Sequence, residues 1–152
     1  MPSERRPRVL YSQNFLRSPQ LVERLVAASS LGPGDLVYEI GPGSGIITRE
    51  LARIGCRVVA VEKDAALAQR LAHDFREAPN VAVHLADFLE FPLPAWPYKV
   101  FANPPFNVSS ALIARLFVDG YGPRDAYLAV QREVVDRLAG RPRETLFGLT
   151  VR

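Results

Sequence analysis

Residues 103–106 read Asn-Pro-Pro-Phe, and their side chains suit one particular reaction. An exocyclic amine on a nucleobase is a poor nucleophile, because its lone pair is delocalised into the ring. Two acceptors on its two N–H groups would draw the nitrogen toward tetrahedral geometry, and the Asn103 side-chain oxygen and the Pro104 carbonyl can be those acceptors. Phe106 offers a face on which an extruded base can stack. We therefore predict that Asn103, Pro104 and Phe106 are catalytic, although an Asn-Pro turn can also simply end a strand.

A second candidate segment, residues 37–45, reads Val-Tyr-Glu-Ile-Gly-Pro-Gly-Ser-Gly. The pattern predicts a short apolar strand that enters a glycine-rich turn and then a helix. Gly41 and Gly43 can take positive φ and leave room for a ligand to touch the backbone. Free N–H groups at the start of the helix would point into the same space. This segment predicts a nucleotide-type cofactor.

The spacing of the glycines does not match a dinucleotide fingerprint, which requires G-x-G-x-x-G. Gly45 comes one place too early, and Ile46 stands where the third glycine is expected. Glu39 precedes the turn, and Asp64 and Asp87 are expected at the same edge. A cluster of carboxylates suits a cationic ligand better than a pyrophosphate. S-adenosylmethionine, with its ammonium and sulfonium groups, fits this description.

Two acids follow the next predicted strands and could hold the nucleoside. Glu62 comes about 20 residues after Gly41, the offset expected for an acid that binds the ribose hydroxyls. Asp87 can accept a hydrogen bond from the adenine amino group, and Phe88 could pack against the ring. The alternative is that both acids are solvated ends of strands.

These residues depend on an alternation of short apolar strands with amphipathic helices. The pattern predicts strands at 36–40, 57–61, 81–85, 98–102, 126–131 and 145–151, and helices from residue 19 to before Gly32 and at 46–54, 65–75, 109–117 and 133–138. Such alternation is typical of an α/β protein with a parallel, doubly wound sheet. Ligands bind at the carboxyl ends of such strands, where all the candidate residues fall. Trp96, between two prolines, is interpreted as a packing anchor.

Composition excludes several classes of protein. The chain has 152 residues, of which 48% are hydrophobic and 23% charged, as in a globular domain. No apolar run approaches the roughly 20 residues of a membrane span, and no signal-peptide core follows the N-terminus, so we expect a cytoplasmic protein without a membrane partner. The single cysteine, Cys56, is expected in the core. Neither His73 nor His84 has a ligand-spaced partner, so no metal is expected.

Taken together, these segments resemble the rRNA adenine N6-methyltransferase family. Residues 12–16 (Ser-Gln-Asn-Phe-Leu) match its N-terminal signature, 39–45 its first cofactor motif and 61–64 its second. Residues 87–88 match the adenine-contacting pair, and 103–106 the catalytic motif. The resemblance runs from about Arg8 to the C-terminus.

The resemblance implies a Rossmann-like class I methyltransferase fold with S-adenosylmethionine as cofactor and rRNA as partner. Residues 1–18 would be a basic arm and a cofactor-contacting segment, and 19–152 the methyltransferase domain. The arginines of the arm and of the last third would contact RNA phosphates. The implied cofactor-binding residues are Gln13, Asn14, Leu16, Glu39, Gly41, Gly43, Glu62, Asp87, Phe88 and Asn103.

Two positions favour the erythromycin-resistance branch, which methylates 23S rRNA and confers macrolide-lincosamide-streptogramin B resistance. Pro104 stands where the 16S dimethyladenosine transferases usually have Leu. Tyr11-Ser12 replaces their usual Phe/Tyr-Gly before Gln13. The alternative is that the chain resembles the 16S branch.

Family members continue with a seventh strand and a small helical C-terminal domain, and the resemblance implies that this chain stops before both. The expected consequences are an incomplete sheet edge, a monomer that could associate through that edge, and weak or absent methylation by this chain alone. Two other hypotheses remain. One is a non-catalytic rRNA-binding or ribosome-assembly module on the same fold. The other is a DNA adenine methyltransferase, although no target-recognition region is evident.

Overall fold

Five parallel strands form one sheet at the centre of the computed structural model, which describes residues 16–104, 106–118 and 122–130. The strand order is β3-β2-β1-β4-β5. The strands are β1 (Leu36–Ile40), β2 (Arg57–Glu62), β3 (Val81–Leu85), β4 (Lys99–Ala102) and β5 (Asp125–Leu128). The sheet grows outward from β1 in both directions, which confirms the predicted doubly wound α/β fold and puts the switch of direction between β1 and β4.

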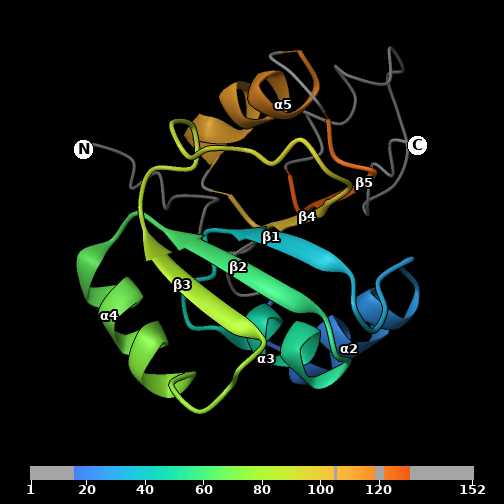
Figure 1. Cartoon of the computed structure of the whole chain (residues 1–152), viewed down its shortest axis with the longest axis vertical. Helices are drawn as coiled ribbons and strands as arrows, with labels where there is room; N and C mark the ends of the chain where they lie inside the picture. The colour runs from blue at the N-terminus through green and yellow to red at the C-terminus, as the bar shows by residue number, and fades with distance from the viewer. Residues whose placement is uncertain (1–15, 105, 119–121, 131–152) are drawn as a thin grey trace, which may run out of the picture.

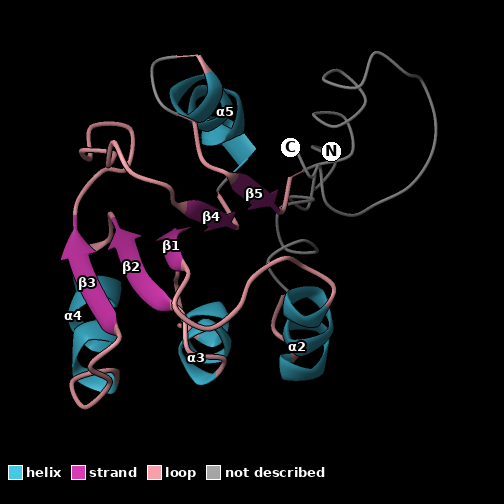
Figure 2. Cartoon of the chain, turned by 45° about the vertical axis from the view of Figure 1, so that its right-hand side comes forward, coloured by secondary structure: helices cyan, strands magenta, loops and turns pink. Residues whose placement is uncertain are grey.

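The helices cover both faces of this sheet (Figure 1). Three of them lie on one face: α2 (Pro19–Ala27), α3 (Ile46–Arg53) and α4 (Ala65–Asp74). On the opposite face lies α5 (Ser109–Phe117), preceded by the 3-10 turn η1 (Phe106–Val108). Figure 2 shows the two layers edge-on, with the long connection from β3 to β4 on the same side as α5.

Alternation along the strands divides the core into two clusters. Val37, Val58 and Ala60 face the layer of α2, α3 and α4. Tyr38 and Val100 face α5 and the connection from β3 to β4. Because the central strands are buried on both faces, their sequences read as nearly continuous apolar runs, which is typical of parallel sheets.

The ends of α2 illustrate what the sequence could and could not predict. Ser18 caps the helix as expected, since its Oγ accepts a hydrogen bond from the Leu21 N–H at 3.3 Å. The helix nevertheless ends at Ala27, well before Gly32. The N–H and hydroxyl of Ser29 both donate to the Val26 carbonyl, at 3.0 and 2.6 Å, and thereby satisfy an end of the helix that needs no glycine.

Other predictions need correction or fall outside the described residues. The strand predicted at 126–131 is shorter and begins at Asp125, and the turn η1 was not predicted. Trp96 is 63% exposed, so the interpretation as a packing anchor is wrong. The helix predicted at 133–138 and the strand predicted at 145–151 lie outside the described residues.

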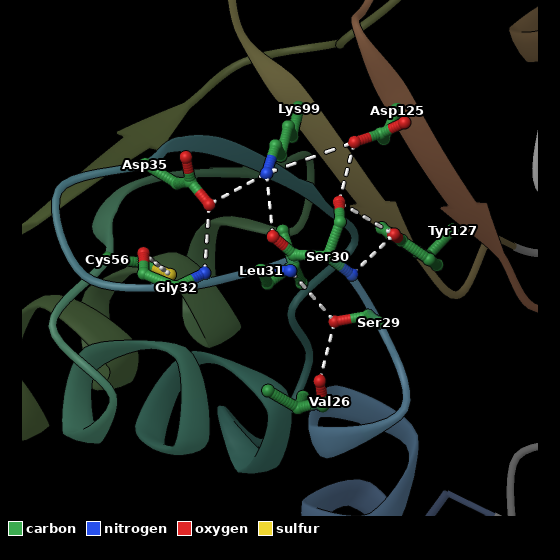
Figure 3. A network of polar contacts seen from close by, with 10 residues as sticks. All are labelled: Val26, Ser29, Ser30, Leu31, Gly32, Asp35, Cys56, Lys99, Asp125 and Tyr127. Atoms are coloured by element: carbon green, nitrogen blue, oxygen red, sulfur yellow. Dashed lines mark hydrogen bonds and ion pairs between the residues drawn. The ribbon is translucent and has the colours of Figure 1, made fainter. Parts of the chain in front are cut away.

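A polar network joins the connection between α2 and β1 to the amino ends of β4 and β5 (Figure 3). The Lys99 ammonium donates to the Ser30 carbonyl and to Asp35 Oδ2, both at 2.8 Å, and lies 3.8 Å from Asp125 Oδ2. Burial alone would raise the pKa of Asp35, but the hydrogen bonds from Lys99 and the Gly32 N–H outweigh it and lower that pKa. This network fixes the edge of the sheet from which the strands begin.

Cys56 lies near this network, with its thiol donating to the Gly32 carbonyl at 3.3 Å. The residue is fully buried, and burial raises the pKa of the thiol to about 11. The prediction that Cys56 belongs to the core is therefore confirmed, since a neutral buried thiol is a poor nucleophile.

Gly45 allows α3 and α4 to pack closely. It lies just before α3 with φ +82, and a Cβ there would stand 2.7 Å from Leu71 Cδ1 and 3.0 Å from Phe75 Cε2. Both neighbours are core side chains near the C-terminal half of α4. The glycine is thus required twice, by its backbone conformation and by the space around it.

We expect Gly45→Ala to destabilise the protein by about 2–4 kcal/mol, from a left-handed backbone and an overpacked core. Gly34→Ala is the matched control, because Gly34 has φ +81 with nothing within 4 Å of its Cβ position. This control should cost only about 1–2 kcal/mol. Urea unfolding monitored by circular dichroism measures both, and equal losses would contradict the packing role.

We expect Lys99→Met to lower the free energy of unfolding by about 1–3 kcal/mol, because it leaves carboxylates without their cation in a partly buried place. The Lys99 side chain is only 12% exposed. Lys63→Met is the control, since Lys63 makes an ion pair of similar length, 2.9 Å to Asp87, but is 77% exposed. That substitution should change stability by less than about 1 kcal/mol. Thermal unfolding of both variants would test this, and similar melting temperatures would contradict it.

Candidate active site

A cavity of about 470 Å³ opens at the carboxyl ends of the central strands. Its walls come from the turn after β1, the end of β2, the segment after β3, the segment after β4 and the start of α5. Its size falls in the range of about 300–1,000 Å³ that small-molecule sites occupy. The expected edge of the sheet thus carries a cavity into which most of the described candidate residues are gathered.

The glycine turn forms one wall and needs two glycines for their backbone conformation. Gly41 has φ +67, and a Cβ there would lie 3.6 Å from the Asn103 carbonyl oxygen. Gly43 has φ +54 with nothing within 4 Å of its Cβ position. At both positions the requirement is therefore the backbone conformation, and at Gly43 the turn also leaves open space.

Glu62 links this turn to the second strand. Its Oε2 accepts a hydrogen bond from the Gly43 N–H at 3.2 Å, and its Oε1 accepts one from the Asp64 N–H at 2.9 Å. The residue is 7% exposed and lines the cavity. Two backbone donors hold the carboxylate in one orientation, and each oxygen keeps a lone pair that could accept from a ligand hydroxyl.

Asp87 and Phe88 form the wall that follows β3. Asp87 Oδ2 accepts from the Lys63 ammonium at 2.9 Å and Oδ1 accepts from the Leu89 N–H at 3.0 Å. The hydrogen bond from Lys63 lowers the pKa of Asp87. Phe88 is 5% exposed and presents part of its apolar surface to the cavity. An adenine amino group that binds Asp87 would share this carboxylate with Lys63 or displace it.

Asn103 and Pro104 line the cavity next to the glycine turn. Their place follows from strand register, because Ile40 pairs with Ala102 and the two chains then turn away side by side. Phe106 begins η1, but its side chain lies outside the described part of the structure. The strand pairing therefore brings the predicted catalytic segment to the predicted cofactor turn.

Glu39 does not line this cavity. It is 1% exposed on the side of β1 that faces α3, where its Oε2 accepts from the Thr48 hydroxyl at 2.6 Å. Burial raises the pKa of Glu39 to about 8, Thr48 opposes this shift by hydrogen bonds from its hydroxyl and its N–H, and repulsion from Glu62 adds to it.

Three predicted cofactor-binding residues come from the segment before α2. Leu16, 4% exposed, packs in the core and also lines the cavity, whereas Gln13 and Asn14 lie outside the described residues. Arg17 and Lys63 line the cavity and were not predicted. The sequence signal that could have identified them is their position directly after Leu16 and Glu62.

Neither a metal site nor a membrane-spanning helix is found in the described part of the chain. Residues 16–104, 106–118 and 122–130 contain no group of three or more His, Cys, Asp or Glu that could hold a metal ion. Within the same ranges, no helix is long and apolar enough to cross a membrane.

The acceptors and apolar surfaces around the cavity fit S-adenosylmethionine. Glu62 offers carboxylate oxygens for ribose hydroxyls and Asp87 for an adenine amino group. Phe88, Val61 and Leu89 supply apolar surface for a purine. The turn at Gly41 and Gly43 leaves the backbone accessible to the methionine part.

Comparison with known proteins agrees with this geometry. A family model described as Ribosomal RNA adenine dimethylase matches residues 5–150. Ribosomal RNA small subunit methyltransferase A from Acaryochloris marina is 35% identical over 97% of this chain and 59% of its own length. The rRNA adenine N-6-methyltransferase from Aeromicrobium erythreum is 41% identical over 71% of this chain and 32% of its own length.

A similar relationship is found among solved structures. The crystal structure of the 23S rRNA methyltransferase ErmE is similar with a TM-score of 0.74 and 30% identity, over 82% of this chain and 50% of that one. The chain spans 59% and 57% of the small-subunit methyltransferases from A. marina and Methylococcus capsulatus. Since the family model covers almost the whole sequence, the chain belongs to the ribosomal RNA adenine dimethylase family.

Proposed function

We propose that the protein is an S-adenosylmethionine-dependent methyltransferase that acts on N6 of an adenine in ribosomal RNA. The observation that carries this proposal is the contact between two turns: the Asn103 carbonyl lies 3.6 Å from the Cβ position of Gly41. A ligand held by the glycine turn would therefore lie next to the Asn-Pro-Pro-Phe segment. Family membership supports the same reaction class.

The residues at β4 would prepare the adenine amine. The Asn103 side-chain oxygen and the Pro104 carbonyl would accept hydrogen bonds from its two N–H groups, and this would free the nitrogen lone pair from the ring. Pro104 has a fixed φ, so the direction of its carbonyl is constrained. No strong general base is needed, because the amine becomes acidic once it is alkylated. The protein would act mainly by positioning.

The residues after β1, β2 and β3 would hold the cofactor. When bound, S-adenosylmethionine supplies a methyl group on a sulfonium that a neutral amine can attack. Glu62 would accept from the ribose hydroxyls, and Asp87 from the adenine amino group of the cofactor. Leu16 and Phe88 close the cavity with apolar surface. From the sequence match, Gln13 and Asn14 would join this group.

The small-subunit rRNA is the target that the relatives favour, in place of the 23S rRNA that the sequence analysis preferred. The A. marina small-subunit enzyme matches 97% of this chain, and the M. capsulatus enzyme matches 93% at 35% identity. A 23S target is the second candidate, supported by Pro104 and by the likeness to ErmE. Antibiotic resistance would follow only from the second.

Cofactor binding is tested by Glu62→Gln, which removes the charge and replaces one carboxylate oxygen, an acceptor for a backbone N–H, with an amide donor. We expect the affinity for S-adenosylmethionine to fall about tenfold or more, since hydrogen bonds to charged groups contribute about 1.5–3 kcal/mol. Glu77→Gln is the control, because the Glu77 side chain is 89% exposed and pairs only with Arg76 among the described residues. Isothermal titration calorimetry measures the dissociation constants. Equal affinity of the wild type, Glu62→Gln and Glu77→Gln for S-adenosylmethionine would show that Glu62 does not bind the cofactor.

Methyl transfer is tested by Asn103→Ala under single-turnover conditions with saturating labelled cofactor. We expect the rate on rRNA to fall by about 100-fold or more, as when one oriented polar group is lost from other active sites. Asn107→Ala is the control, since this exposed amide in η1 does not line the cavity.

The same assay identifies the target when 16S and 23S rRNA are offered separately, each as naked RNA and as the ribosomal subunit. Label in 16S rRNA alone supports the first candidate, and label in 23S rRNA alone supports the second. Cofactor binding without transfer to any RNA would fit a non-catalytic rRNA-binding module and equally the weak or absent methylation that the sequence predicts for this chain alone.

A further inference from the structure

Glu39 is a fully buried acid directly beside the cofactor turn, and it needs an explanation other than contact with a ligand. It is 1% exposed and does not line the cavity. Its neighbours in register are Ala60 on β2 and Phe101 on β4, neither of which carries a charge. Its Oε1 is buried without a hydrogen-bond partner among the described residues. An acid in such a place would normally be replaced by an apolar residue unless it has a specific partner.

Its partner is Thr48, in the first turn of α3. The Thr48 hydroxyl donates to Glu39 Oε2 at 2.6 Å, and both residues are buried. Glu39 is therefore tied to the first turn of α3 by a side-chain hydrogen bond, although it belongs to another element.

The usual capping position cannot perform this task. The N-cap residue is Gly45, which has no side chain and makes no capping hydrogen bond. A Ser, Thr, Asn or Asp there would need φ near +82 and would place its Cβ against Leu71 and Phe75. The close packing of α3 on α4 thus removes the local cap, and the bond from the Thr48 hydroxyl to the carboxyl group on β1 holds the start of the helix instead.

We propose that Glu39 is a positioning residue for the cofactor turn, in that it holds the first turn of α3 through the Thr48 hydroxyl and thereby fixes both ends of residues 41–45. This role rests on the proposed function in one respect: S-adenosylmethionine is the ligand whose affinity measures the conformation of the turn. One end of the turn begins two residues after Glu39, where β1 ends, and the other continues into the helix whose first turn is bonded to Glu39.

The protonation state of Glu39 distinguishes this role from that of a charged ligand for a cation. Burial raises its pKa to about 8, and Glu62 is the acid whose repulsion adds to this effect. The N-terminus of α3 favours an anion, but by only about 0.3–1 kcal/mol at most sites. At neutral pH Glu39 is therefore mainly the neutral acid, and a glutamine would reproduce its shape and its acceptor for Thr48.

The test compares Glu39→Gln, Glu39→Leu, Thr48→Ser and Thr48→Val by calorimetry with S-adenosylmethionine at pH 7. We expect Glu39→Gln and Thr48→Ser to bind within about threefold of the wild type, because each keeps the hydrogen bond between the two side chains. We expect Glu39→Leu and Thr48→Val to bind about tenfold more weakly, because each loses it. The rescue by glutamine is the result that a charged ligand role would not give.

A second readout is the dependence of unfolding free energy on pH. The carboxyl pKa of Glu39 is raised above its unfolded value, so the unfolded chain loses its proton first. Wild-type stability should therefore fall as pH rises from about 4.5 to about 8 relative to Glu39→Gln, and the difference should be constant above that range. A parallel pH dependence of the two proteins would show that Glu39 is not held neutral.

Two outcomes overturn the proposal. One is a loss of affinity beyond tenfold in Glu39→Gln with unchanged stability, which would make Glu39 a charged ligand of the cofactor. The other is failure of Glu39→Gln to fold while Thr48→Ser folds, which would show that the charge itself is needed. Absence of binding to the wild-type protein would instead contradict the proposed function, and the pH dependence of unfolding would still test the protonation of Glu39.

Discussion

The pairing of β1 with both β2 and β4 is the constraint on which the rest of the site depends. β1 is the strand from which the sheet grows in both directions, so the residues after it have a neighbouring chain on each side. The Gly41 N–H donates to the Val61 carbonyl on one side, and the Asn103 carbonyl lies against Gly41 on the other. A Cβ at Gly41 would lie at an ordinary van der Waals distance from the Asn103 carbonyl, so the glycine is needed for its φ of +67. The cofactor turn and the Asn-Pro-Pro-Phe segment are thus parts of one packed unit.

The amino ends of the strands carry stabilising contacts, whereas the carboxyl ends carry the candidate site. Where the strands begin, Lys99 ties the connection before β1 to β4 and β5 through short polar contacts. Where the strands end, the backbone turns irregularly around a cavity, and acids stand at its wall. The amino ends of the strands are held by the contacts of Lys99 and do not depend on the loops at the carboxyl ends. The loops at the carboxyl ends can therefore be shaped by ligand chemistry instead of by stability.

The sequence predicted the elements whose signals are local. The strands β1 and β3 and helix α5 have the predicted bounds, because apolar runs and flanking glycine, proline and serine define them within a few residues. Predictions failed where a distant or unusual partner decides. Ser29 ends α2 through the Val26 carbonyl without a glycine, and Trp96 is exposed despite its flanking prolines. Gly45 looked like a misplaced member of a fingerprint, yet its role depends on Leu71 and Phe75.

The charge of the acids near the site also depends on surroundings that the sequence does not reveal. From the sequence, Glu39, Asp64 and Asp87 form one carboxylate cluster that favours a cationic ligand. In the structure their surroundings differ: Asp64 caps α4 by accepting from the Leu67 N–H at 3.0 Å, and Asp87 is paired with Lys63. Glu39 is buried with its pKa raised to about 8. A cation in the cavity would therefore meet less negative charge than the sequence count implies. The preference for S-adenosylmethionine over a dinucleotide then depends mainly on the glycine spacing and on Asn103 beside Gly41.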